Sequence, residues 1–138
     1  MSSTLKRPKF ISTQVSDVRY YFLDTRPAAP GGLRVICGGC ERCNPEYRID
    51  HRDFPFHSIE YVARGRGEVR LRGRTFRLQP ASAFYYGPGI PHTIVNSPND
   101  PMVKYFVDFA GRDVPALPRQ SPLRDGVVDV AAPSEIQD

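Results

Sequence analysis

The chain has 138 residues and a formal net charge of +4, a length that suits one domain with its own core and is too short for two. Its 14 prolines and 11 glycines indicate many turns and few long helices. It contains no apolar run near the roughly 20 residues that span a membrane, and its N-terminus lacks the apolar stretch of a secretory signal. Three cysteines, an odd number, argue against a disulfide framework and favour a reducing cytoplasm.

Short strands dominate the pattern along the chain, with no helix of ordinary length before the last residues. Residues 1–32 are interpreted as a polar arm and a mixed first segment that ends in the Pro- and Gly-rich run at 26–32. Beyond it, apolar runs of strand length alternate with turn signals, a spacing typical of a sandwich or barrel. The sequence therefore predicts an all-β domain over 33–111. The expected strands are 33–37, 47–51, 56–63, 67–72, 75–79, 82–86, 92–96 and 102–109.

The clearest of these elements is an arginine-rich hairpin at 67–79. Val69 and Leu71 alternate with Arg70 and Arg72, so the apolar pair is expected to face the core and the arginines to face water. A basic face could contact nucleic acid through its phosphates. It lacks the interleaved aromatic residues of a single-stranded nucleic-acid site, so we favour a solvated face.

The C-terminal segment 112–138 is interpreted as a Pro-rich linker that ends in the start of a helix. The stretch 110–128 has no strand or helix periodicity. Ser134 and Gln137 then form a capping box preceded by Pro133. A single turn is not stable alone because helix nucleation is costly. We therefore expect the chain to be cut at a domain boundary, with more protein beyond it.

Two short signatures resemble the two motifs of cupin proteins. Glu60 and Gly67 fit the end of the first motif, and Gly89, His92 and Asn96 fit the second. A hairpin pattern lies between them. The resemblance implies a cupin-like double-stranded β-helix, or jelly-roll, barrel with a pocket inside.

A catalytic metal site of the cupin kind is not predicted. The paired histidines expected before the glutamate are absent from residues 53–56, and His57 lies three positions from Glu60. Odd spacing in a strand places two side chains on opposite faces. Glu60 and His92 alone do not complete a 2-His-1-carboxylate site, and neither a catalytic triad nor a phosphate loop is recognisable. We therefore assign no catalytic residue, metal ligand or cofactor.

The three cysteines leave a zinc site as an alternative. Cys37, Cys40 and Cys43 contain a Cys-x-x-Cys spacing, which can supply half of a structural zinc site. No second ligand pair follows at a standard spacing, and strand alternation would place Cys40 opposite the other two. We favour small buried thiols.

The remaining polar residues suit a pocket that binds a small molecule. Arg52 can fork to a carboxylate or to several hydroxyls. Lys104 and Phe106 share one face of the last strand, and Tyr86 and His92 flank the turn at the barrel mouth. Arg52 could instead join a surface ion pair, and His92 could only cap the turn. The candidate ligand-binding residues are Arg52, Glu60, Tyr86, His92, Lys104 and Phe106.

From residue 47 to residue 111 the resemblance becomes specific. The runs YRIDHR, EYVARGRG, YGPGIPH and VKYFVDFAG are similar, in order and spacing, to the N-terminal cupin-type effector domain of bacterial AraC-type transcriptional regulators. In that family the barrel binds a small effector, often a sugar, without metal. The domain commonly dimerises, and a linker leads to two helix-turn-helix units that bind DNA.

The resemblance also implies residue roles. Arg52 corresponds to the arginine that enters the first pocket strand, and His92 to the histidine after the proline-glycine turn. Lys104 and Phe106 stand where the arabinose-binding members have His and Trp, which implies a different effector, a sugar or a small carboxylate. Residues 1–14 could form the N-terminal arm known in the family.

These implications describe the effector-sensing and oligomerisation domain of a cytoplasmic regulator, without its DNA-binding half. It would meet DNA only through the missing C-terminal domain, with a homodimer possible and no membrane partner. A standalone metal-dependent cupin enzyme using Glu60 and His92 is the alternative from another class. A standalone sugar-binding module is a third.

Overall fold

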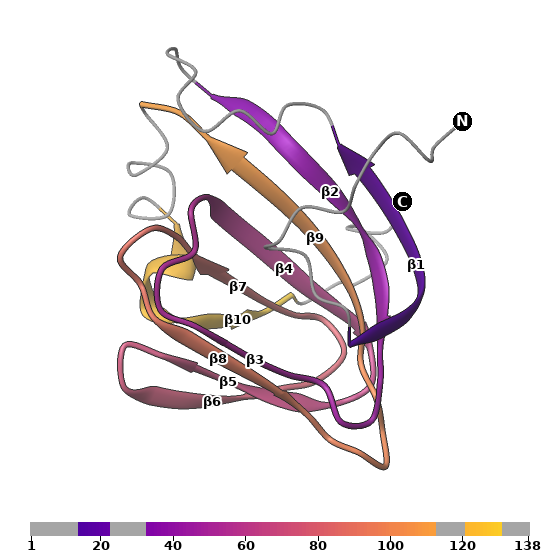
Figure 1. Ribbon diagram of the computed structural model, residues 1–138. Helices are drawn as coiled ribbons and strands as arrows, with labels where there is room; N and C mark the ends of the chain where they lie inside the picture. The colour runs from indigo at the N-terminus through magenta and orange to yellow at the C-terminus, as the bar shows by residue number, and fades with distance from the viewer. Residues whose placement is uncertain (1–13, 23–32, 113–120, 131–138) are drawn as a thin grey trace, which may run out of the picture.

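Two antiparallel sheets face each other and form a barrel (Figure 1). The structure is a computed structural model that describes residues 14–22, 33–112 and 121–130. The described part is almost entirely strand and confirms the all-β barrel expected from the spacing of apolar runs and turns. None of its helical segments is long and apolar enough to cross a membrane.

The larger sheet has six strands and forms the upper wall in Figure 1. Long-range pairs build it: the second strand lies beside the ninth, and the ninth beside the fourth. The sequence therefore folds back on itself several times before this wall is complete. In spatial order the strands are β1 (Val15–Phe22), β2 (Arg34–Cys43), β9 (Val103–Ala110), β4 (His57–Arg64), β7 (Ser82–Tyr86) and β10 (Val127–Asp129).

The smaller sheet has four strands and forms the opposite wall. Its inner face carries the alternating apolar residues of the hairpin. Val69 is fully buried and Leu71 nearly so, while Arg70 and Arg72 are exposed. The expected direction of these side chains is confirmed. In spatial order the strands are β3 (Arg48–His51), β8 (His92–Asn96), β5 (Gly67–Leu71) and β6 (Arg74–Leu78).

Backbone geometry explains the glycines of the sequence signatures. A Cβ at Gly67 would lie 2.4 Å from the carbonyl oxygen of Val95 and 2.7 Å from Cε of Met102, so no side chain fits there. Gly89 has a φ of 79°, and the β5–β6 turn at Arg72 and Gly73 has φ angles of 51° and 81°. Two positive φ angles in a two-residue loop are typical of the type I′ turn that matches strand twist.

The sequence prediction differs from the structure at both ends of the barrel. The segment expected as an irregular linker contains a 3₁₀ turn, η2 (Pro122–Asp125), and strand β10, which pairs with β7. Three residues are too few for a visible strand period, and the prolines before them suggested irregular chain. At the other end, Val15–Phe22 is a strand paired with β2. The arm at 1–13 and the helix start at Ser134 lie outside the described residues.

The cysteines of β2 lie on both faces of the six-stranded sheet, as the alternation predicted. Cys37 and Cys43 are buried inside the barrel, and Cys40 is half-buried. None of the three belongs to a disulfide in the described part of the chain. Burial, as the largest cause, raises the pKa of Cys37 and of Cys43 well above the usual thiol range. The two buried thiols are therefore protonated and unreactive.

Candidate ligand-binding site

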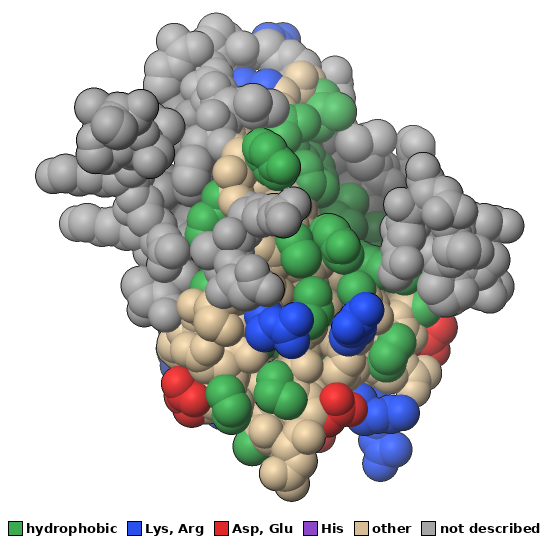
Figure 2. Space-filling model, turned by 90° about the vertical axis from the view of Figure 1, so that its right-hand side faces the viewer, with side chains coloured by type: hydrophobic (Ala, Val, Ile, Leu, Met, Phe, Trp, Pro, Cys, Tyr) green, Lys and Arg blue, Asp and Glu red, His purple; other side chains and the backbone are tan. Residues whose placement is uncertain are grey.

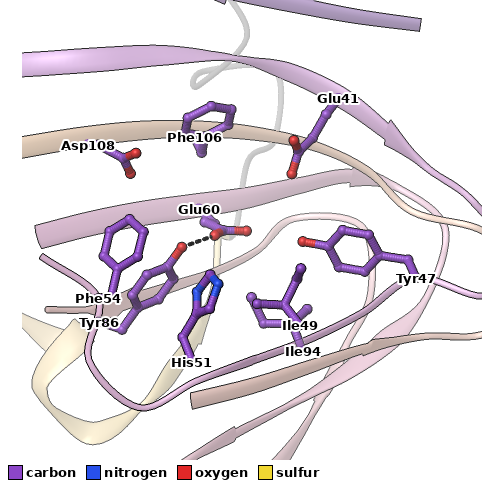
Figure 3. Close-up of a pocket in the computed structure, with 10 residues that line it drawn as sticks. All are labelled: Glu41, Tyr47, Ile49, His51, Phe54, Glu60, Tyr86, Ile94, Phe106 and Asp108. Atoms are coloured by element: carbon purple, nitrogen blue, oxygen red, sulfur yellow. Dashed lines mark hydrogen bonds between the residues drawn. The ribbon is translucent and has the colours of Figure 1, made fainter. Parts of the chain in front are cut away.

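A cavity of about 30 Å³ lies between the two sheets. Room for a water molecule takes about 10–15 Å³ of such volume, so the cavity accepts a compact polar group in the present conformation. Figure 3 shows side chains reaching it from both walls of the barrel. The lining residues are Glu41, Tyr47, Ile49, His51, Phe54, Glu60, Tyr86, Ile94, Phe106 and Asp108.

Lys104 forms the electrostatic centre of the wall behind the cavity. Its side chain is fully buried, and its Nζ lies 2.5 Å from Glu60 Oε1 and 3.5 Å from Glu41 Oε1. The same nitrogen donates to Tyr47 Oη at 2.9 Å. Burial alone would lower the pKa of Lys104, but Glu60, Tyr47 and Glu41 outweigh it and hold the pKa above its ordinary value. Lys104 is therefore a charged ammonium whose donors are all engaged.

Glu60 is engaged on both oxygens. Oε1 accepts from Lys104, and Oε2 accepts a short hydrogen bond from the hydroxyl of Tyr86. Burial, and then Glu60, raise the pKa of Tyr86 above its ordinary value, so the phenol remains a donor. Glu60 on β4 is thus held from both neighbouring strands, by Lys104 on β9 and by Tyr86 on β7.

Tyr20 connects the first strand to the cavity wall. Its hydroxyl donates to Glu41 Oε2 at 3.0 Å. Its ring meets the ring of Phe106 edge-on, with 5.9 Å between centroids. Any ligand that displaces Glu41 or Phe106 would therefore also act on β1.

Asp108 is the third buried carboxyl group at the cavity. Its Oδ2 accepts from Cys37 Sγ at 3.3 Å, and its Oδ1 is buried without a hydrogen-bond partner. Burial raises the pKa of Asp108 to about 7. The group therefore changes charge near neutral pH, unlike an ordinary aspartate.

Two histidines face each other across strands β3 and β8. His51 pairs with His92, and their ring centroids are 5.2 Å apart. His92 stacks on Tyr86 at 3.7 Å between centroids, and its Nδ1 lies 3.3 Å from the carbonyl oxygen of Ile90. Because a carbonyl only accepts, Nδ1 carries the proton in this contact. Burial lowers the pKa of His92 to about 4 and lowers that of His51, so both rings are neutral at pH 7.

The structure gathers five of the six sequence-predicted residues at or beside the cavity. Glu60, Tyr86 and Phe106 line it; Lys104 lies behind Glu60, and His92 lies behind Tyr86. The sixth, Arg52, is exposed and is not among the lining residues. Arg52 directly follows His51, which lines the cavity. Successive side chains of an extended chain point to opposite faces, so Arg52 points away from the cavity.

Sequence reasoning missed seven of the ten lining residues. Glu41 was missed because the strand expected at 33–37 in fact continues to Cys43. Tyr47 lies in the expected strand 47–51 but was not chosen as a candidate. Asp108 shares the parity of Lys104 and Phe106 on β9, so that alternation was a usable signal. Nothing in the sequence indicated that His51 and Phe54 would also contribute.

No group of three or more potential metal-ligating side chains occurs in the described residues. The chemistry of Glu60 gives a reason for this at the cupin-like motifs. Both of its oxygens are occupied by Lys104 and Tyr86, and a buried ammonium stands where a cation would bind. His57 lies against Tyr85 and Phe109, on the face opposite the cavity, as its odd spacing from Glu60 predicted.

The sequence profile of the AraC-like ligand-binding domain matches residues 39–137. The range covers most of the chain and includes the segment that looked like a linker. No curated protein matches the sequence. The chain belongs to the AraC-like ligand-binding domain family, whose members are cupin-type barrels.

Solved structures with the same fold include YhaK from Escherichia coli, with a TM-score of 0.60 and 15% identity over 83% of this chain and 51% of that chain. The cupin domain of Cnp3 from Schizosaccharomyces pombe has a TM-score of 0.53 and 14% identity, covering 78% of this chain and 75% of that one. The protein plu4264 from Photorhabdus luminescens has a TM-score of 0.52 and 12% identity, covering 75% and 83%. The chain spans about half the length of YhaK. These identities show a shared fold only.

Replacing Lys104 with methionine tests the centre of the buried network. The substitution leaves Glu60 and Glu41 buried without a cation, so we expect a loss of about 3–5 kcal/mol in the free energy of unfolding at pH 7. Urea denaturation measures it. The double variant Lys104→Met/Glu60→Gln should recover part of that loss, because its remaining buried charge is smaller. An additive double variant would contradict the coupling of the two residues.

The raised pKa of Asp108 predicts a free energy of unfolding that falls as the pH rises. Its pKa of about 7 in the folded protein lies above the unfolded value of about 3.9. The folded state therefore holds a proton that the unfolded state has lost between about pH 4 and pH 7, and stability decreases by roughly 4 kcal/mol across that window. Denaturation curves should show this decrease in the wild type and in Asp100→Asn, an exposed control. Asp108→Asn should lack it; an unchanged pH profile in that variant would assign the decrease elsewhere.

Proposed function

We propose that this chain is the effector-sensing domain of an AraC-type transcriptional regulator, and that it binds a small molecule inside the barrel. The observation that carries the proposal is the cavity between the sheets, with buried polar and aromatic side chains converging on it. A concave site with a few convergent polar groups is the usual form of a small-molecule site. The family match supports the same reading.

Effector binding would act through differential affinity for two arrangements of the domain. A ligand can shift an equilibrium only by contacts that differ between the states. Tyr20 supplies such a contact, because it bonds to Glu41 and packs on Phe106. A ligand that moves either residue would change how tightly β1 is held, and with it the segment that precedes β1.

A hexose needs more space than the present cavity offers, so we propose that a large effector would bind with opening of the wall. Of the lining residues, His51 and Phe106 are half-buried and the others buried. The cavity wall is therefore expected to open beside His51 and Phe106. A small carboxylate is less well supported than a neutral or cationic ligand because three carboxyl groups already line the cavity: Glu41, Glu60 and Asp108.

Dimerisation is part of the proposal. Figure 2 shows hydrophobic side chains gathered along the middle of one side of the molecule. Tyr21, Val35 and Tyr105 are large exposed hydrophobic residues of β1, β2 and β9. The strand register places all three on the outer face of the six-stranded sheet. Exposed apolar patches of this kind mark protein interfaces.

DNA recognition would rest on a helix-turn-helix half that is separate from this barrel, in a cytoplasmic bacterial protein. A metal-dependent cupin enzyme is the weaker alternative. Its carboxylate ligand would be Glu60, which is already bound to Lys104 and Tyr86.

A thermal-shift screen of neutral sugars, amines and small carboxylates tests the effector proposal. A true effector at 100 times its dissociation constant should stabilise the chain by about 2.7 kcal/mol. The effect should vanish in Phe106→Ala, which removes one wall of the cavity, and persist in Arg52→Ala, which changes an exposed residue. Stoichiometric iron, manganese, nickel or zinc that is lost on Glu60→Gln would instead support the enzyme.

Sedimentation analysis tests the dimer. The wild-type chain should sediment as a dimer, and the double substitution Tyr21→Lys/Tyr105→Lys should shift it to a monomer because it places charges in the apolar contact. Thr75→Lys on the opposite sheet is the matched control and should leave the dimer intact. A monomeric wild type would contradict the proposal.

A further inference from the structure

Two polar atoms of the cavity wall remain able to accept a hydrogen bond from a ligand. Asp108 Oδ1 and His51 Nδ1 are both buried and have no hydrogen-bond partner in the structure, and both residues line the cavity. Tyr86 donates to Glu60 and Tyr20 donates to Glu41. Ser58, the cross-strand neighbour of Asp108 on β4, adds a further buried hydroxyl, and its hydrogen bonding lowers the pKa of Asp108. A buried acceptor left without a partner is costly. A ligand that brings donors would recover this loss.

The charge around the cavity is negative. Three carboxyl groups line it, and none of its ten lining residues is a lysine or arginine. Lys104 balances one carboxylate, but its side chain is fully buried and already engaged by Glu60, Glu41 and Tyr47. His51 adds no positive charge because burial lowers its pKa. An anion would therefore enter against repulsion, and a cation would be attracted.

The apolar part of the lining also suits a cation. Phe54, Tyr86, Tyr47 and Phe106 contribute aromatic rings. Figure 3 shows Phe54 and Tyr86 on one side of the cavity and Tyr47 on the other, with Phe106 above them. Aromatic faces attract ammonium groups, most strongly where water is excluded. The volume of about 30 Å³ fits a compact head group.

We propose that the cavity binds the ammonium group of a small organic amine, with Asp108 as its counter-ion and His51 as a second acceptor. The inference rests on the proposed effector-binding function and names the chemical class of the effector. Asp108 comes from β9 and His51 from β3, on opposite sheets, and in the view of Figure 3 the Tyr86–Glu60 hydrogen bond lies between them. The three N–H donors of a primary ammonium match the unpaired acceptors, which a carboxylate cannot do.

A proton accompanies this binding. The groups that act on Asp108 are Cys37 and Glu41 from β2, Ser58 and Glu60 from β4 and Tyr86 from β7; His51 from β3 lines the same cavity, and Lys104 lies four positions earlier on β9. Burial, and then Glu60 and Glu41, raise the pKa of Asp108 to about 7 against the lowering effect of its hydrogen bonds with Ser58 and Cys37. An ammonium group would favour the ionised form, so Asp108 releases its proton as the ligand binds. Affinity therefore rises as pH increases through 7.

Three probes with one two-carbon skeleton test the charge preference: 2-aminoethanol as its cation, neutral ethylene glycol and anionic glycolate. NMR titration of the ¹⁵N-labelled chain should show 2-aminoethanol shifting the amides around the cavity. We expect its dissociation constant to be at least about tenfold lower than that of ethylene glycol and glycolate, since a ten-fold preference corresponds to only about 1.4 kcal/mol. Raising the pH from 6 to 8 should tighten its binding by about tenfold, as the ionised fraction of Asp108 grows.

Asp108→Asn keeps the shape of the side chain and removes its charge. It should abolish the pH dependence and most of the preference for the cation, while Asp100→Asn, an exposed carboxylate paired with Arg66, should change neither. If Asp108→Asn does not fold, the probe comparison and pH series on the wild type still decide the question. Equal or tighter binding of ethylene glycol or glycolate at the cavity amides would overturn the amine inference and leave the effector pocket standing. No shift with any probe would overturn the amine inference, and the thermal-shift screen decides the effector pocket separately.

Discussion

The ammonium group of Lys104 joins three neighbouring strands of the larger sheet, β2, β9 and β4, around one buried charge. It comes from β9 and binds carboxylates from β4 and β2, the two strands on either side of it. Because a buried charge without a partner is costly, these three strands must keep their register for the network to survive. Through Glu60 the same network orients Tyr86 on β7, and through Glu41 it orients Tyr20 on β1. The cavity is the space that remains beside this arrangement.

This network also occupies the glutamate of the first cupin-like motif. The glutamate of the first motif is present, but it is neutralised by a lysine on a strand more than 40 residues further along the chain. A protein ammonium group thus stands in the position of a cation. What remains exposed to the cavity is a set of acceptors from Asp108 and His51. The fold is shared with other cupin-type barrels, but a fold does not decide what a site does, so function has to be argued from the site.

The limits of sequence reasoning are visible at particular residues. Strand period and turn chemistry are local, so three features could be predicted from the sequence: the hairpin, the glutamate and histidine signatures, and the alternating pair on β9. Arg52 was expected in the pocket by positional correspondence, and the structure places it on the surface. Glu41 was overlooked because a strand with two central glycines, Gly38 and Gly39, does not show a clear period. Strand β10 was overlooked because three residues carry no periodic signal.

The sequence by itself determined the class of fold, the inward and outward faces of its strands and the family, since these depend on residue order over short distances. Only the tertiary structure decided that Glu60 is bound by Lys104 and Tyr86, that Asp108 keeps one oxygen without a hydrogen-bond partner, and that His51 lines the same cavity. These groups are separated by up to 57 residues along the chain, from His51 to Asp108. Their proximity follows from strand pairing and barrel closure, which bring together side chains that share no local pattern.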